Sequence, residues 1–311
     1  METRPYLTAT GPSRRLSSKN LINSEIYVQI PAYRDAELSK TLLNLYGKAA
    51  YPERLRTAVM WQHGVGEKLD KKVLRLPHLE LFRIPYSSSQ GCNWARNYLQ
   101  QQWRGEPYTL LLDSHHRFVK DWDVRLVGMY EKLKREGISK PIITAYLPPY
   151  DPQQEPSGRM RDVLKIYPLQ NKNGLLTKLT SFAVVFWKNL EQPIPADFVS
   201  LHFLFAEGQF NSEIIADPEI YFLGDEVVTS LRAFTRGYDF FHPHRILGWH
   251  SYDRKTRVTH WRDHKNWNNL EEESLRKIRK IYSGKLIYGS KAKQVRCIAD
   301  FEARIQRRLI S

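Results

Sequence analysis

The sequence is poor in cysteine and has no long apolar run. Cys92 and Cys297 are its two cysteines, and neither belongs to a C-x-x-C pair, which argues against a disulfide framework and a finger-type zinc site. No segment approaches the roughly 20 apolar residues of a membrane span, and residues 1–20 lack the apolar core of a secretory signal. These features predict a cytoplasmic protein without a transmembrane segment.

Three familiar motifs are also missing. The chain contains neither G-x-G-x-x-G nor G-K-[ST], which argues against a dinucleotide fingerprint and a P-loop. It contains no G-x-S-x-G, which argues against an α/β-hydrolase.

The charge is strongly basic and unevenly distributed. The formal net charge is +15, and residues 251–311 hold 16 Lys and Arg against 7 Asp and Glu. Such a surplus suits nucleic acid, an anionic membrane surface, a phosphorylated ligand, or simply a solvated helix face. A nucleic-acid-binding protein, whose binding would depend steeply on salt, is therefore one alternative to an enzyme.

Apolar runs alternate with helical patterns through the first 113 residues. Strands are predicted at 25–33, 55–62, 79–86 and 108–113, and helices at 35–50 and 93–103. Pro31 is expected to stop the first strand, and Asp35 to cap the helix after it. This alternation predicts an α/β fold with a mainly parallel sheet, in which ligands bind beyond the carboxyl ends of the strands.

The second half is less regular, and the tail is basic and helical. Strand-like segments are predicted at 179–188, 201–210 and 238–252, with a helix at 225–237. We expect a flexible lead over residues 1–22, a catalytic domain over 23–265, and a helical basic segment over 266–311 that packs on it.

In the stretch "TLLLDSHHRF", residues 109–118, a buried strand is followed directly by polar and charged residues. In an extended segment Asp113 and His115 share a face, so they offer a carboxylate and an imidazole to one divalent cation. Two protein ligands leave coordination positions open, which suits a metal shared with a diphosphate. The imidazole favours Mn²⁺ over Mg²⁺. The candidates for a third ligand are His242, His244, His250, His260 and His264.

Two further segments carry candidate site residues. "SSSQGCNWARN", residues 87–97, starts a helix ahead of Arg96, which could reach a phosphate. "YFLGDEVV", residues 221–228, places Asp225 and Glu226 where they either accept hydrogen bonds from a substrate hydroxyl or cap a helix.

Four segments together resemble one known family. "IPAYRD", "DSHHRFVKDWD", "DPEIYFLGDEVVTSLRAFTRGYDFFHPHRILGWHSY" and, more faintly, "YGSKAKQVRCIADFEARI" are similar to the cytoplasmic UDP-GlcNAc:polypeptide α-N-acetylglucosaminyltransferases of glycosyltransferase family 60. The eukaryotic members modify hydroxyproline on a ubiquitin-ligase subunit. The resemblance runs in order from about residue 25 to 305 and is most specific over residues 217–252. The Asp-x-His form also resembles the polypeptide GalNAc-transferases.

The resemblance implies a GT-A fold: a Rossmann-like, mainly parallel mixed sheet flanked by helices. It implies that Asp113 and His115 bind the metal and that a later histidine completes the set, for which His250 is chosen and His242 is second. The remaining implied residues are Pro31, Ala32, Tyr33, Arg34 and Arg96 for the nucleotide, and Asp225 and Glu226 near the acceptor and donor sugar. "LHFLFAEG", residues 201–208, resembles the family's strand that faces the sugar. The start of this segment differs from the pattern of small residues found there in the family.

The function expected from the resemblance is transfer of GlcNAc from UDP-GlcNAc to a hydroxyl of a protein or glycan acceptor, with retention. The cofactor is Mn²⁺ or Mg²⁺. Alternatives are another donor, such as UDP-GalNAc or UDP-Glc, and a nucleotide-sugar hydrolase. No nucleic-acid partner is expected on this hypothesis, and a peripheral membrane contact stays open.

Overall fold

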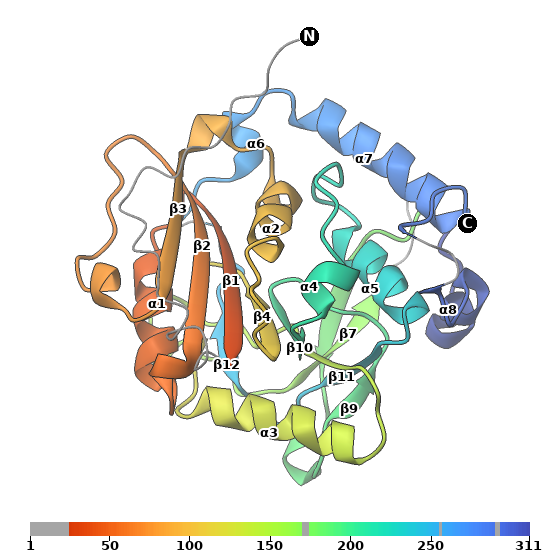
Figure 1. The fold of residues 1–311 in the computed structure, drawn as a ribbon, viewed down its shortest axis with the longest axis horizontal. Coiled ribbons are helices and arrows are strands. Elements are labelled where there is room, and N and C mark those ends of the chain that lie inside the picture. Colours follow the sequence, from red (N-terminus) through yellow and green to blue (C-terminus); the bar gives the residue numbers. More distant parts are fainter. Residues whose placement is uncertain (1–24, 170–173, 255–256, 290–292) are drawn as a thin grey trace.

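A mixed eight-stranded sheet forms the centre of the protein (Figure 1). The structure is a computed structural model that describes residues 25–169, 174–254, 257–289 and 293–311, so the expected lead at 1–22 lies outside the described residues. The strands follow the order β3-β2-β1-β4-β10-β6-β11-β9. Their bounds are β1 Ile26–Tyr33, β2 Leu55–His63, β3 Leu79–Pro85, β4 Tyr108–Leu112, β6 Pro141–Thr144, β9 Ile194–Ala196, β10 Phe203–Glu207 and β11 Asp239–His242.

Parallel pairing dominates the half of the sheet that holds β1 to β4. Strands β3, β2, β1 and β4 are mutually parallel, β10 is antiparallel to β4 and β6, and β11 is parallel to β6. Two small ribbons complete the strands: β5 (His116–Phe118) with β12 (Gly248–His250), and β7 (Leu164–Pro168) with β8 (Leu179–Ala183). The predicted α/β fold with a mainly parallel mixed sheet is confirmed.

Helices cover both faces of this sheet, which explains why its central strands are apolar throughout. The helices are α1 Leu38–Lys48, α2 Cys92–Gln100, α3 Trp122–Arg135, α4 Phe210–Glu213, α5 Asp225–Thr235, α6 His260–Asp263, α7 Trp267–Tyr282 and α8 Ile298–Ile305. Alternate residues of β1 enter different clusters: Val28 packs with α1 and α3, whereas Tyr27 packs with α2. Side chains of α5, α7 and α8 form a third cluster with β10 and β11.

Several boundaries differ from the sequence expectation. Pro31 does not stop β1, which continues to Tyr33 beside β2; the pairing with β4 ends at Gln29, so a proline is tolerated beyond it. The segment 201–210 is a strand followed by the short helix α4, and 238–252 divides into β11 and β12.

Asp35 is not the N-cap of α1, contrary to the expectation. The helix begins at Leu38 with Glu37 at the cap position, and no side chain caps it. Asp35 instead turns toward the end of β4, as described below.

The basic tail is part of the folded body. Ile278 of α7 and Phe301 of α8 are fully buried in the cluster that also contains Val227 and Leu231 of α5. Figure 1 shows α7 and α8 along the side of the molecule that holds α5. None of the described helices combines the length and apolar character needed to cross a bilayer.

Candidate active site

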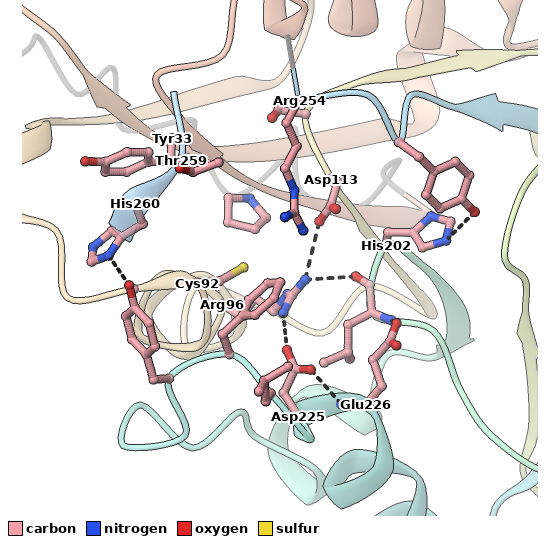
Figure 2. Close-up of a pocket in the computed structure, with 18 of the residues that line it drawn as sticks. Tyr33, Cys92, Arg96, Asp113, His202, Asp225, Glu226, Arg254, Thr259 and His260 are labelled. Atoms are coloured by element: carbon pink, nitrogen blue, oxygen red, sulfur yellow. Dashed lines mark hydrogen bonds and ion pairs between the residues drawn. The ribbon is translucent and has the colours of Figure 1, made fainter. Parts of the chain in front are cut away.

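A cavity of about 500 Å³ opens where the carboxyl ends of β1 and β4 meet the first turns of α2 and α5 (Figure 2). Gly91 and Cys92 line it from α2, and Gly224 and Asp225 from α5. Gly91 has φ of +109°, and a Cβ there would lie 3.2 Å from the Tyr221 ring, so glycine keeps the chain close to the cavity. Because two helix N-termini face it, the cavity favours an anionic ligand.

Asp113, His115 and His250 converge at this cavity. The Oδ2 atom of Asp113 lies 3.7 Å from His115 Nε2 and 3.5 Å from His250 Nε2. One ligand atom from each residue lies within 4.8 Å of the others. The antiparallel ribbon β5–β12, which pairs His116 with His250, carries His250 back to the residues that follow β4.

The surroundings of these groups fit metal binding. Within the described part of the chain, His115 Nε2 and both ring nitrogens of His250 are buried without a hydrogen bond. Burial lowers the pKa of His250, so the neutral ring that metals require is favoured. Burial alone would raise the pKa of Asp113, but the interaction with His250 and the charge of Arg96 hold it well below its usual range. The residues present therefore suit a divalent metal.

Asp35 orients His115, a role that the sequence interpretation missed. Its Oδ2 lies 2.7 Å from His115 Nδ1 and accepts a 2.6 Å hydrogen bond from Ser114 Oγ, while Oδ1 accepts one from the Glu37 amide. This carboxylate holds the proton on Nδ1, which leaves the Nε2 lone pair directed toward Asp113. Its position just past the end of β1, the strand beside β4, is the sequence signal that could have identified it.

Arg96 joins the two acidic parts of the cavity wall, as Figure 2 shows. Its guanidinium lies 3.3 Å from Asp113 and 3.1 Å from Asp225, and the residue is 6% exposed. It also donates to the Leu201 carbonyl at 3.4 Å. A contact of Arg96 with a phosphate or uridine stays a prediction.

Asp225 and Glu226 begin α5 but are more than caps. Gly224 occupies the cap position, and Glu226 accepts hydrogen bonds from the Leu201 amide at 3.0 Å and from the Tyr146 hydroxyl. Burial, followed by the neighbouring Asp225 carboxylate, raises the pKa of Glu226 to about 7. Glu226 is thus a carboxyl group that can exchange a proton near neutral pH.

Of the four residues at 31–34 expected to contact the nucleotide, two line the cavity and two do not. Pro31 and Tyr33 line the cavity. Ala32 is fully buried in the core, and Arg34 pairs with Asp263 of α6 at 2.9 Å, so these two side chains turn away from the cavity.

The other histidine candidates for the third ligand lie elsewhere. His242 is buried, with Nδ1 2.8 Å from the Thr144 carbonyl and Nε2 accepting from the Ile166 amide, so both nitrogens are satisfied. His260 stacks on His264 with ring centroids 3.8 Å apart, and its Nδ1 lies 2.6 Å from the Tyr221 hydroxyl. This aromatic end of the cavity also contains Tyr33, 5.0 Å from His260 (Figure 2).

A comparison of the sequence with protein families identifies the chain. The profile of the Glycosyltransferase (GlcNAc) family matches residues 25–71 and 65–306, which is most of the chain. The chain belongs to this family. The cavity described above is the candidate active site of this member of the glycosyltransferase family. No curated protein sequence matches this glycosyltransferase.

Solved structures show the same fold at low sequence identity. GalNAc-T7, crystallised with UDP, GalNAc and Mn²⁺, is 12% identical with a TM-score of 0.57, and the match covers 92% of this chain and 55% of that one. TarS from S. aureus is 10% identical with a TM-score of 0.55, covering 91% and 42%. Mannosyltransferase PcManGT from Pyrobaculum calidifontis, solved with GDP-Man and Mn²⁺, is 12% identical with a TM-score of 0.50, covering 90% and 69%. The glycosyltransferase thus spans about half the length of GalNAc-T7, and the expected GT-A fold is confirmed.

Proposed function

We propose that this glycosyltransferase transfers GlcNAc from UDP-GlcNAc to a hydroxyl of a protein or glycan, with retention at the anomeric carbon. The observation that carries the proposal is the convergence of Asp113, His115 and His250 in a cavity that the N-termini of α2 and α5 also line. Among the described residues, His115 Nε2 and both ring nitrogens of His250 have no hydrogen-bond partner. The structure of GalNAc-T7 with UDP and Mn²⁺ supports a UDP-sugar donor.

Asp113, His115 and His250 would hold the divalent metal. A bound metal supplies positive charge that stabilises a departing diphosphate. One carboxylate and two imidazoles favour Mn²⁺ over Mg²⁺, because imidazole is a softer ligand than the oxygens Mg²⁺ prefers.

Side chains around these ligands supply further binding. The first turns of α2 and α5 direct amide groups at the anion. Arg254 also lines the cavity, with its guanidinium over the Trp261 ring at 4.9 Å (Figure 2). Tyr33 and His260 offer ring faces to the uracil base at the other end of the cavity.

Glu226 is the residue proposed to orient an acceptor or sugar hydroxyl, and Asp225 to keep Arg96 in place. The pKa of Glu226 is raised to about 7, and its carboxylate accepts hydrogen bonds from the Tyr146 hydroxyl and the Leu201 amide. Attack on the face from which the diphosphate departs demands no separate base, which suits a retaining reaction.

Thermal melting of the purified chain tests the donor. The panel is UDP, UDP-GlcNAc, UDP-GalNAc, UDP-Glc and GDP-Man, each with Mn²⁺ and with EDTA. A ligand that binds the native state at one hundred times its Kd adds about 2.7 kcal/mol, so a Mn²⁺-dependent rise with UDP-GlcNAc and not with GDP-Man is expected. A matched Asp113→Asn variant should show no such rise. If no uridine nucleotide shifts the melting temperature, the proposed donor is wrong.

Product analysis then separates transfer from hydrolysis. With an acceptor present, a transferase releases less free sugar than UDP, whereas a nucleotide-sugar hydrolase releases equal amounts. Equal release at every acceptor concentration would replace the proposed function with hydrolysis.

A further inference from the structure

Three buried histidines, His116, His202 and His250, lie close together beside the proposed metal site. His250 is also a ligand of that site, whereas His116 and His202 have no part in the proposed transfer. His116 comes from β5, His202 from the loop before β10, and His250 from β12. They are 0%, 6% and 4% exposed, and one ring nitrogen from each lies within 4.8 Å of the others.

The ring hydrogen of His116 is on Nδ1, the nitrogen that points away from His202. Its Nδ1 lies 3.0 Å from the backbone carbonyl of Asp113, and a carbonyl can only accept, so Nδ1 carries the hydrogen. The lone pair of His116 is therefore on Nε2, which faces His202 at 3.4 Å.

His202 lies between Tyr252 and His116. Tyr252 gives its single hydroxyl hydrogen to the Leu147 carbonyl at 2.9 Å, and its oxygen lies 3.4 Å from His202 Nε2. His202 Nδ1 faces His116 Nε2 at the same distance of 3.4 Å. A hydrogen on Nε2 would bond to Tyr252 and leave the Nδ1 lone pair for a metal, whereas a hydrogen on Nδ1 would bond to His116.

In the tautomer that bonds to Tyr252, two nitrogen lone pairs face each other across 3.4 Å, an arrangement that a bound cation would stabilise. Two imidazole nitrogens on one tetrahedral zinc, at bonds of about 2.0–2.1 Å, stand roughly 3.3 Å apart, close to the observed separation. His250, whose two ring nitrogens make no hydrogen bond within the described residues, supplies a third donor.

We propose that His116, His202 and His250 form a second metal site, made entirely of imidazole, for a Zn²⁺-type transition metal. Three imidazoles without a carboxylate suit Zn²⁺, Co²⁺ or Cu²⁺ and not Mn²⁺ or Mg²⁺. His202 and His250 line the cavity, so the site is reached from it. Because His250 also belongs to the triad with Asp113 and His115, the two sites share one ring and compete for it.

Metal titration of the full chain without any sugar nucleotide tests the proposal. Co²⁺ is the probe, since tetrahedral Co²⁺ absorbs strongly in the visible range, and Mn²⁺ affinity is measured in parallel by calorimetry. In His202→Gln we expect Co²⁺ affinity to fall roughly tenfold or more, while Mn²⁺ affinity changes less than about twofold. Asp113→Asn should show the reverse. His244→Gln, a half-buried histidine outside both triads, is the matched control and should bind both metals as the wild type does.

A measurement on the wild type keeps the test independent of folding in the variants. Pulsed electron paramagnetic resonance with one equivalent of Cu²⁺ counts the imidazoles on the metal. Three coupled rings support the proposal, and two rings, as the triad with Asp113 provides, overturn it. Unchanged Co²⁺ affinity in a folded His202→Gln protein also overturns it. Neither result depends on the donor sugar, so failure here leaves the proposed transfer reaction standing.

Discussion

Replacing Asp35 with Asn keeps the shape of a buried side chain and removes the charge that orients His115. Asp35 is 7% exposed, and its Oδ2 faces both His115 Nδ1 and Ser114 Oγ. In the variant, Oδ1 still accepts from the Glu37 amide, so the new amide nitrogen stands where Oδ2 was. An amide N–H facing His115 Nδ1 moves the ring proton to Nε2, which removes the lone pair directed toward Asp113.

The expected loss follows from this change of tautomer. Removing the partner that orients a metal-binding histidine costs about 10- to 100-fold in metal affinity, or about 1.4–2.7 kcal/mol. Calorimetric titration of the purified chain with Mn²⁺ in the presence of UDP measures the loss directly.

Asp123→Asn provides the matched control. Asp123 is 4% exposed and accepts hydrogen bonds from the Ala50 and Tyr51 amides at 2.8 and 2.9 Å, away from the cavity. It undergoes the same chemical change and should bind Mn²⁺ as the wild type does. Wild-type Mn²⁺ affinity in Asp35→Asn, or an equal loss in both variants, would refute the reasoning.

Three further predictions concern the acidic wall of the cavity. Asp113→Ala should lower turnover at least about a hundredfold, because the lost metal contributes several kcal/mol, and circular dichroism should show an intact fold. Arg96→Met leaves Asp113 and Asp225 without their cation, so the free energy of unfolding should fall by about 3–5 kcal/mol in urea titrations; a loss below about 1 kcal/mol would contradict this. The folded state raises the pKa of Glu226 from 4.5 to about 7, so the bound proton stabilises the fold below pH 4.5 and that stability is lost as pH rises toward about 7. Glu226→Gln should therefore gain stability relative to the wild type as pH rises from about 4.5 to about 7, and parallel pH profiles of the two proteins over that range would exclude it.

Much of the sheet could be predicted because apolar runs are a local signal. The runs at 55–62 and 108–113 became the buried strands β2 and β4, and the run at 79–86 became the partly buried strand β3, each with a shift of one residue. The interruption at Pro31 misled the interpretation, because the cost of a missing N–H depends on which strand lies beside it. That neighbour is set by the sheet register and cannot be seen locally.

The candidate site shows the same limit. Asp113 and His115 stand together at the end of a predicted strand, so their proximity follows from the sequence. The choice of His250 over His242 came from the family resemblance, and the structure brings His250 to Asp113 while His242 bonds to backbone groups. Whether these residues bind a metal stays a prediction.

The sequence by itself determined most strands and helices of the first 113 residues and the helix α5, and it placed an acid and an imidazole at the end of a buried strand. Hydrophobic period and strand ends are properties of neighbouring residues, so they survive without knowledge of the fold. Only the tertiary structure decided that Asp35 holds the proton of His115, that Arg96 lies between two carboxylates, and that His202 faces His116. Each of these contacts joins residues from separate elements, and their tautomers and charges depend on distances of a few ångströms that the folded chain alone sets.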